Sequence, residues 1–144
     1  MSGVTDFLEI AKRDYKICLK VESDFPDEYA ISGAAYHMQQ AIEKLLKAMM
    51  LLYGVQPEFT HNIAKLVAKC RDHGITLPDA IEQVADTLTL WESSSRYDPF
   101  ISFSQHKYQT AKQIYNELVV QVENVIQKSF GEQDQQPKGP ALNL

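Results

Sequence analysis

Three polar side chains along one predicted helix are suited to binding an anionic ligand. His37, Gln40 and Lys44 are three and four residues apart, so at roughly 100° per residue they follow one border of the apolar face of that helix. They offer an imidazole, an amide and a cation. Each residue alone is more simply explained as a solvated border residue, but as a set they can contact a phosphate or another polar anion.

A second candidate group follows a later predicted helix. Arg96 has a planar fork of donors that suits phosphate, and Tyr97 has a ring on which a base can stack. The simpler alternative is an ordinary turn, in which Asp98 bonds to Arg96 and Pro99 ends the extended stretch.

His61 is the third candidate for a ligand site. It lies between Thr60 and Asn62 at a predicted helix start, where the helix dipole disfavours a protonated imidazole. Capping of the helix explains Thr60 and Asn62 without any function. His61 can still face a pocket.

The same sequence does not predict a metal site, a cofactor site or a nucleophile. The four histidines lack convincing ligands at the spacing of three or four residues that a helical metal pair needs. The serines at Ser93, Ser94 and Ser95 have no Gly-x-Ser-x-Gly elbow around them. Cys18 and Cys70 are isolated, so they indicate neither a disulfide framework nor a zinc site.

Length and composition indicate one globular domain. The chain has 144 residues, of which 44% are hydrophobic and 23% are charged. The net charge of −5 argues against avid nonspecific binding of nucleic acid. No apolar run has the length of a membrane span and the first residues do not form a signal peptide, so we expect a cytoplasmic protein that does not enter a membrane.

The elements that must position these residues are helices. Apolar residues recur at spacings of three and four, and no segment has the alternation of a strand. Five helices are predicted, at about residues 5–21, 27–53, 60–73, 76–95 and 104–129, with Gly54, Gly74 and Gly131 as stop signals. Residues 1–130 form the domain, and residues 131–144 are expected to be a disordered tail.

Short connections between long helices favour antiparallel neighbours. The predicted fold is therefore all-α, an up-down bundle of four to five helices. The segment at about residues 27–53 is the longest, so it is expected to form the centre of the domain.

Three blocks of residues carry a resemblance to a known family. They are Tyr36-His37, Gln39-Gln40-Ala41, Glu43-Lys44 and Leu46-Lys47-Ala48, then Thr60-His61-Asn62-Ile63 with Leu66, then Arg96-Tyr97. In this order they resemble the HEPN domain family. The resemblance implies a helical bundle that usually dimerises. It also implies either a ribonuclease toxin or a non-catalytic module that binds nucleotides or RNA, in many cases paired with a small nucleotidyltransferase as a toxin–antitoxin system.

The chain departs from the ribonuclease members of that family. Those members have an arginine, then four to six residues, then a histidine. After Arg96, the positions where that histidine is required hold Ile101, Ser102 and Phe103, and the next histidine is His106. No catalytic residue is therefore assigned.

Three interpretations of function follow. The leading one is a non-catalytic HEPN module that binds a nucleotide, another polyanion or a nucleotidyltransferase partner in a groove at a homodimer interface. Its proposed ligand-binding residues are His37, Gln40, Lys44, Arg96, Tyr97 and His61. The second is a metal-independent ribonuclease toxin that uses Arg96 and His106 as a variant active site. The third is a structural helical subunit that only makes protein contacts.

Overall fold

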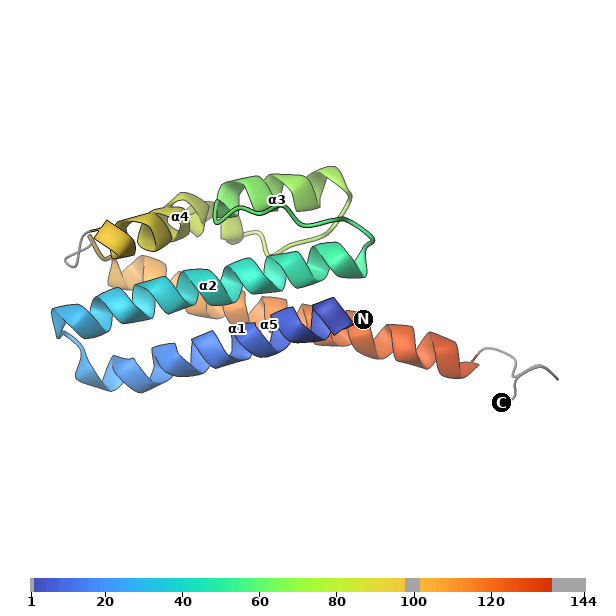
Figure 1. The fold of residues 1–144 in the computed structure, drawn as a ribbon, viewed down its shortest axis with the longest axis horizontal. Coiled ribbons are helices and arrows are strands. Elements are labelled where there is room, and N and C mark those ends of the chain that lie inside the picture. The colour runs from blue at the N-terminus through green and yellow to red at the C-terminus, as the bar shows by residue number, and fades with distance from the viewer. Residues whose placement is uncertain (1, 98–101, 136–144) are drawn as a thin grey trace.

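The computed structural model describes residues 2–97 and 102–135, with side chains over residues 3–94 and 102–129. These residues form five α-helices and one short 3₁₀ helix, η1 (Glu22–Asp24), and they contain no strand (Figure 1). The α-helices are α1 (Ser2–Val21), α2 (Glu28–Leu52), α3 (Ile63–Asp72), α4 (Ile81–Tyr97) and α5 (Gln105–Gln135). The predicted all-α helical bundle is confirmed.

Helix α2 is the centre of the bundle, as its length predicted. It packs against each of the other four α-helices. In Figure 1, α1 runs antiparallel along one side of α2, α3 and α4 lie on its other side, and α5 passes behind. The apolar stripe predicted for α2 is fully buried at Ala34, Met38, Ala41, Leu45 and Met49. Polar side chains of α2 lie between α1 and the segment that leads into α3.

Local capping signals set the ends of α2 and α3. The Asp27 carboxylate accepts a hydrogen bond from the Ala30 backbone N–H at 3.0 Å and starts α2. Asn62 Oδ1 accepts from the Lys65 backbone N–H at 3.0 Å and starts α3. Gly54 and Gly74 follow these helices with φ of 75° and 73°, a conformation that side chains with a Cβ rarely adopt.

Replacing Asn62 with alanine is expected to lower the free energy of unfolding by about 1 kcal/mol, the usual contribution of an N-cap side chain. Urea unfolding measures the loss. Asn62→Asp is the matched control, because its carboxylate still accepts the Lys65 N–H bond. Equal losses in both variants would contradict a capping role.

Several predicted helix boundaries are wrong. Helix α1 begins at Ser2 and not near residue 5, and both ends of α4 differ from the prediction. Helix α4 begins at Ile81 and not near Thr76, because Ile75 and Leu77 are buried in the non-helical segment before it. It continues through the serines to Tyr97, so Arg96 and Tyr97 end a helix and do not begin a loop. Ser93 Oγ bonds to the Thr89 and Leu90 carbonyls of the preceding turn, at 3.3 and 3.4 Å, so its hydroxyl is satisfied within the helix.

The predicted stop at Gly131 is also wrong, since α5 continues to Gln135. A glycine inside a helix costs about 1 kcal/mol relative to alanine, which a long helix can tolerate. The start of α5 agrees with the prediction, because Ser104 Oγ accepts from the Lys107 backbone N–H at 3.2 Å. Residues 136–144, most of the predicted tail, lie outside the described residues.

Candidate functional site

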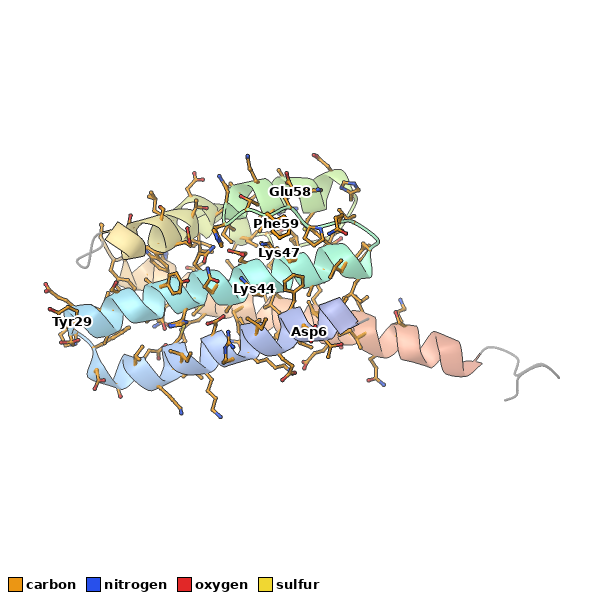
Figure 2. The ribbon with its side chains drawn as sticks, viewed as in Figure 1. Asp6, Tyr29, Lys44, Lys47, Glu58 and Phe59 are labelled. Atoms are coloured by element: carbon orange, nitrogen blue, oxygen red, sulfur yellow. The ribbon has the colours of Figure 1, made fainter. Side chains whose placement is uncertain are left out.

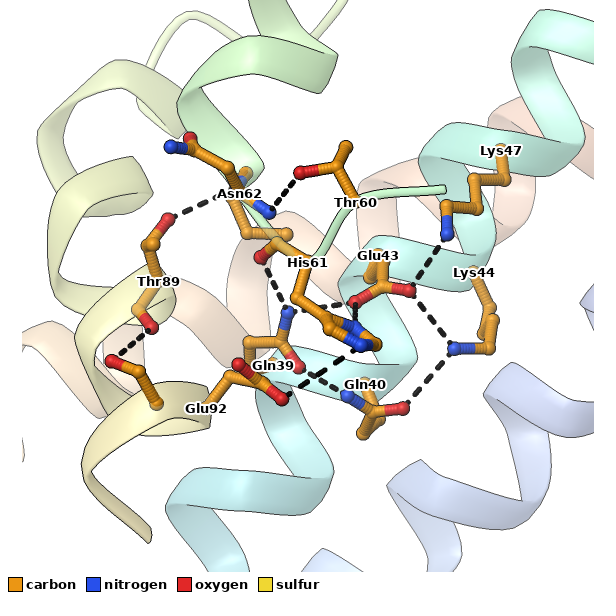
Figure 3. A network of polar contacts seen from close by, with 12 residues as sticks. Gln39, Gln40, Glu43, Lys44, Lys47, Thr60, His61, Asn62, Thr89 and Glu92 are labelled. Atoms are coloured by element: carbon orange, nitrogen blue, oxygen red, sulfur yellow. Dashed lines mark hydrogen bonds and ion pairs between the residues drawn. The ribbon is translucent and has the colours of Figure 1, made fainter. Parts of the chain in front are cut away.

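A completely buried carboxylate on α2 is the centre of the largest polar network among the described side chains (Figure 3). Glu43 Oε1 accepts hydrogen bonds from Gln39 Nε2 and His61 Nδ1, both at 2.9 Å. Glu43 Oε2 accepts from Lys44 Nζ at 3.1 Å and from Lys47 Nζ at 3.0 Å. We call the residues that surround this carboxylate the Glu43 cluster, and they are Gln39, Gln40, Glu43, Lys44, Lys47, His61 and Glu92.

The Glu43 carboxyl is held in its ionised form. Burial opposes ionisation and by itself raises the pKa of this group. The hydrogen bonds from Gln39 and His61 and the two lysine ammonium groups outweigh burial, and they lower the pKa of Glu43 to about 2. The carboxylate therefore acts as a fixed acceptor that orders four donor side chains around it.

His61 connects the segment before α3 to α2. Its Nδ1 lies against the ionised Glu43, which can only accept, so Nδ1 carries the proton of that hydrogen bond. Its backbone carbonyl accepts from Gln39 Nε2 at 3.1 Å. The imidazole is 48% exposed, and its Nε2 lies 3.9 Å from Glu92 Oε2 on α4. One imidazole nitrogen is thus fixed inside the protein, while about half of the ring surface faces solvent.

Lys44 and Gln40 form the outer part of the cluster. Lys44 Nζ donates to Gln40 Oε1 at 3.1 Å, and Gln40 Nε2 donates to Gln39 Oε1 at 2.6 Å. An ammonium group has three donors, and contacts among the described residues use two of those on Lys44. No other described residue uses the third donor of Lys44, so that donor is available to a ligand.

The charges of the cluster balance closely. Glu43 and Glu92 supply two negative charges, and Lys44 and Lys47 supply two positive charges. The cluster is therefore neutral when His61 is neutral and carries one positive charge when His61 is protonated.

His37 belongs to a different pair. Its Nδ1 lies 2.8 Å from Asp14 Oδ1, on a carboxylate of α1 that is itself buried, and the Tyr36 ring meets the imidazole edge-on. His37 precedes Lys44 by about two helical turns on α2. The structure thus brings Gln40, Lys44 and His61 into one network and places His37 in a separate carboxylate–imidazole pair.

The remaining predicted site residues lie near the ends of α4 and α5. The side chains of Arg96 and Tyr97 lie outside the described side chains, although the backbone of both residues belongs to α4. Arg96 follows Glu92 by four positions, about one turn. His106 is exposed in the first turn of α5, and its backbone carbonyl accepts from Thr110 Oγ1 at 3.1 Å.

Sequence reasoning missed the residues that organise the site. The sequence prediction contains Glu43 only within the family motif, and it contains neither Asp14 nor Glu92. A signal was present for Glu43, because Gln39, Lys44 and Lys47 lie four residues before it and one and four residues after it. No comparable signal links Asp14 to His37, which is 23 positions away in the chain.

Within the described residues, no group of three histidine, cysteine, aspartate or glutamate side chains can hold a metal ion. In the same part of the chain, no helix has the length and apolar character needed to cross a membrane.

A comparison with protein-family models matches residues 4–132 to the HEPN domain. The chain belongs to the HEPN domain family. All residues of the Glu43 cluster lie within the matched part of this HEPN domain. Comparisons with curated proteins and with solved structures find no match.

Proposed function

We propose that this HEPN domain is a non-catalytic binding module that takes a nucleotide or a similar anionic ligand at the outer side of the Glu43 cluster. The observation that carries the proposal is the fixed position of Lys44 and His61, which one buried carboxylate holds from its two oxygens. Lys44 keeps one N–H donor that the cluster does not use. About half of the His61 side chain faces solvent, and its Nε2 can donate to a phosphate when the imidazole is protonated.

Preorganisation is the physical advantage of this arrangement. A ligand that meets side chains already held in one geometry does not have to immobilise them, so less binding free energy is lost to side-chain ordering. Charge-assisted hydrogen bonds to phosphate are among the strongest in proteins. The near-neutral cluster gives little attraction at long range, which suits a small ligand better than a long polyanion.

Lys44→Gln is expected to weaken binding of adenosine monophosphate about 10- to 100-fold, because one charge-assisted hydrogen bond contributes about 1.5–3 kcal/mol. A thermal-shift screen first identifies which nucleotides bind. Isothermal titration calorimetry then measures the affinity. Lys65→Gln is the matched control, since Lys65 is exposed on α3 and its side chain makes no described contact. The absence of a thermal shift with any nucleotide at millimolar concentration would refute the proposal.

We also propose that the protein binds protein partners. The HEPN family supports a homodimer and a small nucleotidyltransferase partner in a toxin–antitoxin-like pair, with His37, Arg96 and Tyr97 contributing to a groove between protomers. Sedimentation equilibrium tests the dimer, and the neighbouring reading frame tests the partner. A tight protein complex that ignores nucleotides but needs the Glu43 cluster would favour a purely structural subunit.

A ribonuclease with a variant site is the second candidate. The observation in its favour is the carboxylate–imidazole pair of Glu43 and His61, since such a pair fixes the tautomer of an acid–base histidine. Arg96 would stabilise charge on the phosphate, with His61 or His106 as the acid or base. This candidate predicts RNA cleavage without added metal and growth arrest on expression. If the Arg96→Ala, His106→Ala double variant retains both activities, Arg96 and His106 do not form the active site.

A further inference from the structure

Phe59 lies in the segment between α2 and α3 with its side chain entirely in solvent. Its exposed fraction is 106%, the highest among the exposed large hydrophobic side chains of the described residues. It is not one of the side chains that pack against the core. Burial in the folded chain therefore does not explain an aromatic residue at this position.

The backbone that carries Phe59 is nevertheless held in place on both sides. The Thr60 N–H donates to the Glu58 carbonyl at 3.0 Å, and Lys69 Nζ donates to the Gln56 carbonyl at 3.1 Å. Two residues after Phe59, the His61 carbonyl accepts from Gln39 on α2. An exposed ring on a restrained segment loses less conformational entropy on binding than a ring on a free loop.

Phe59 is close to His61 of the Glu43 cluster in the chain, which limits its distance from the cluster in space. Two residues span at most about 7 Å between Cα atoms, so Phe59 lies within that reach of His61. Figure 2 labels Phe59 on the segment that returns along α2, in the same part of the view as Lys47 and Lys44. His61 and Lys47 both bond to the Glu43 carboxylate, so the residue two positions after Phe59 is fixed on the same side of the cluster as Lys47.

We propose that Phe59 is the stacking platform for the base of a nucleotide whose phosphate lies at Lys44 and His61. This inference rests on the proposed function and narrows its ligand class to molecules that carry a nucleobase. Every base has a flat face that can stack on an aromatic ring. The exposed Glu58 carboxylate beside the ring disfavours phosphate at that end, which orients the phosphate toward Lys44.

The test compares adenosine monophosphate with ribose 5-phosphate, which differ only by the base. Calorimetry is expected to show that the wild type prefers the nucleotide about 10- to 100-fold, the factor that base–aromatic stacking provides. Phe59→Ala is expected to lower nucleotide affinity to that of ribose 5-phosphate and to leave ribose 5-phosphate binding unchanged. Phe59→Trp is expected to keep the preference and to report the base by quenching of its indole fluorescence.

Tyr53→Ala is the matched control, because Tyr53 is a partly exposed aromatic residue at the end of α2. The melting temperatures of the variants are expected to match that of the wild type, because the substituted positions are exposed, and this measurement confirms that the variants fold. Equal wild-type affinity for the two ligands would overturn this inference but leave the proposed anion site standing. Loss of the preference in Tyr97→Ala but not in Phe59→Ala would also overturn it. If neither ligand binds the wild type, both the proposed function and this inference fail.

Discussion

Glu43→Leu is expected to lower the free energy of unfolding by about 3–5 kcal/mol, the range for removing one partner of a buried ion pair. The substitution removes the acceptor of four hydrogen bonds while the donors remain. Most of the loss in unfolding free energy is expected to come from Lys47, because its ammonium group bonds to Glu43 and its side chain is only 10% exposed. An ammonium group buried without a counter-ion is strongly unfavourable.

Urea unfolding monitored by circular dichroism measures this loss. Glu9→Ala is the matched control, since Glu9 is an exposed carboxylate 3.9 Å from Lys12, and such pairs contribute only about 0–1 kcal/mol. Adding Lys47→Met to Glu43→Leu is expected to recover part of the stability, because the second change removes the unpaired charge. A loss in Glu43→Leu as small as that in Glu9→Ala would show that the cluster does not stabilise the fold.

Acid is expected to remove about 3 kcal/mol of stability through Glu43 alone. Its pKa is about 2 in the folded protein against an ordinary value of 4.5, and each unit of difference corresponds to about 1.4 kcal/mol. Because the folded pKa is the lower one, this contribution is fully present above about pH 5. It is lost as the pH falls from the ordinary value toward the folded value.

Glu43→Gln separates this contribution from those of other groups. The variant has no titrating group at position 43, so the difference in unfolding free energy between wild type and variant is expected to narrow as the pH falls from 5 to 2. Other carboxylates titrate in both proteins and cancel from the difference to first order. A difference that stays constant over this range would contradict the lowered pKa of Glu43.

Features that depend on near neighbours in the chain could be predicted from the sequence. The buried stripe of α2, the Asn62 cap of α3 and the stops at Gly54 and Gly74 all follow from residues within a few positions of one another. The three blocks of residues around Glu43, His61 and Arg96 indicated the HEPN family, and the family match over residues 4–132 confirms this prediction.

The same local signals failed at two helix ends. Thr76 is a typical residue for a helix start, but Ile75 and Leu77 are buried in a segment that stays non-helical until Ile81. Gly131 is a common stop signal, but α5 continues beyond it. Propensities of this kind are worth about 1 kcal/mol or less per residue, and tertiary contacts readily exceed them.

The candidate site likewise combines features that the sequence predicts with contacts that only the tertiary structure decides. The sequence by itself determined that His37, Gln40 and Lys44 follow one border of a helix, because helical periodicity is a local property. Only the tertiary structure decided that His61, which is 18 positions after Glu43, closes over that border. It also decided that His37 pairs with α1 and not with the cluster. The physical reason is that such contacts depend on how helices pack, which the spacing of residues along one helix does not specify.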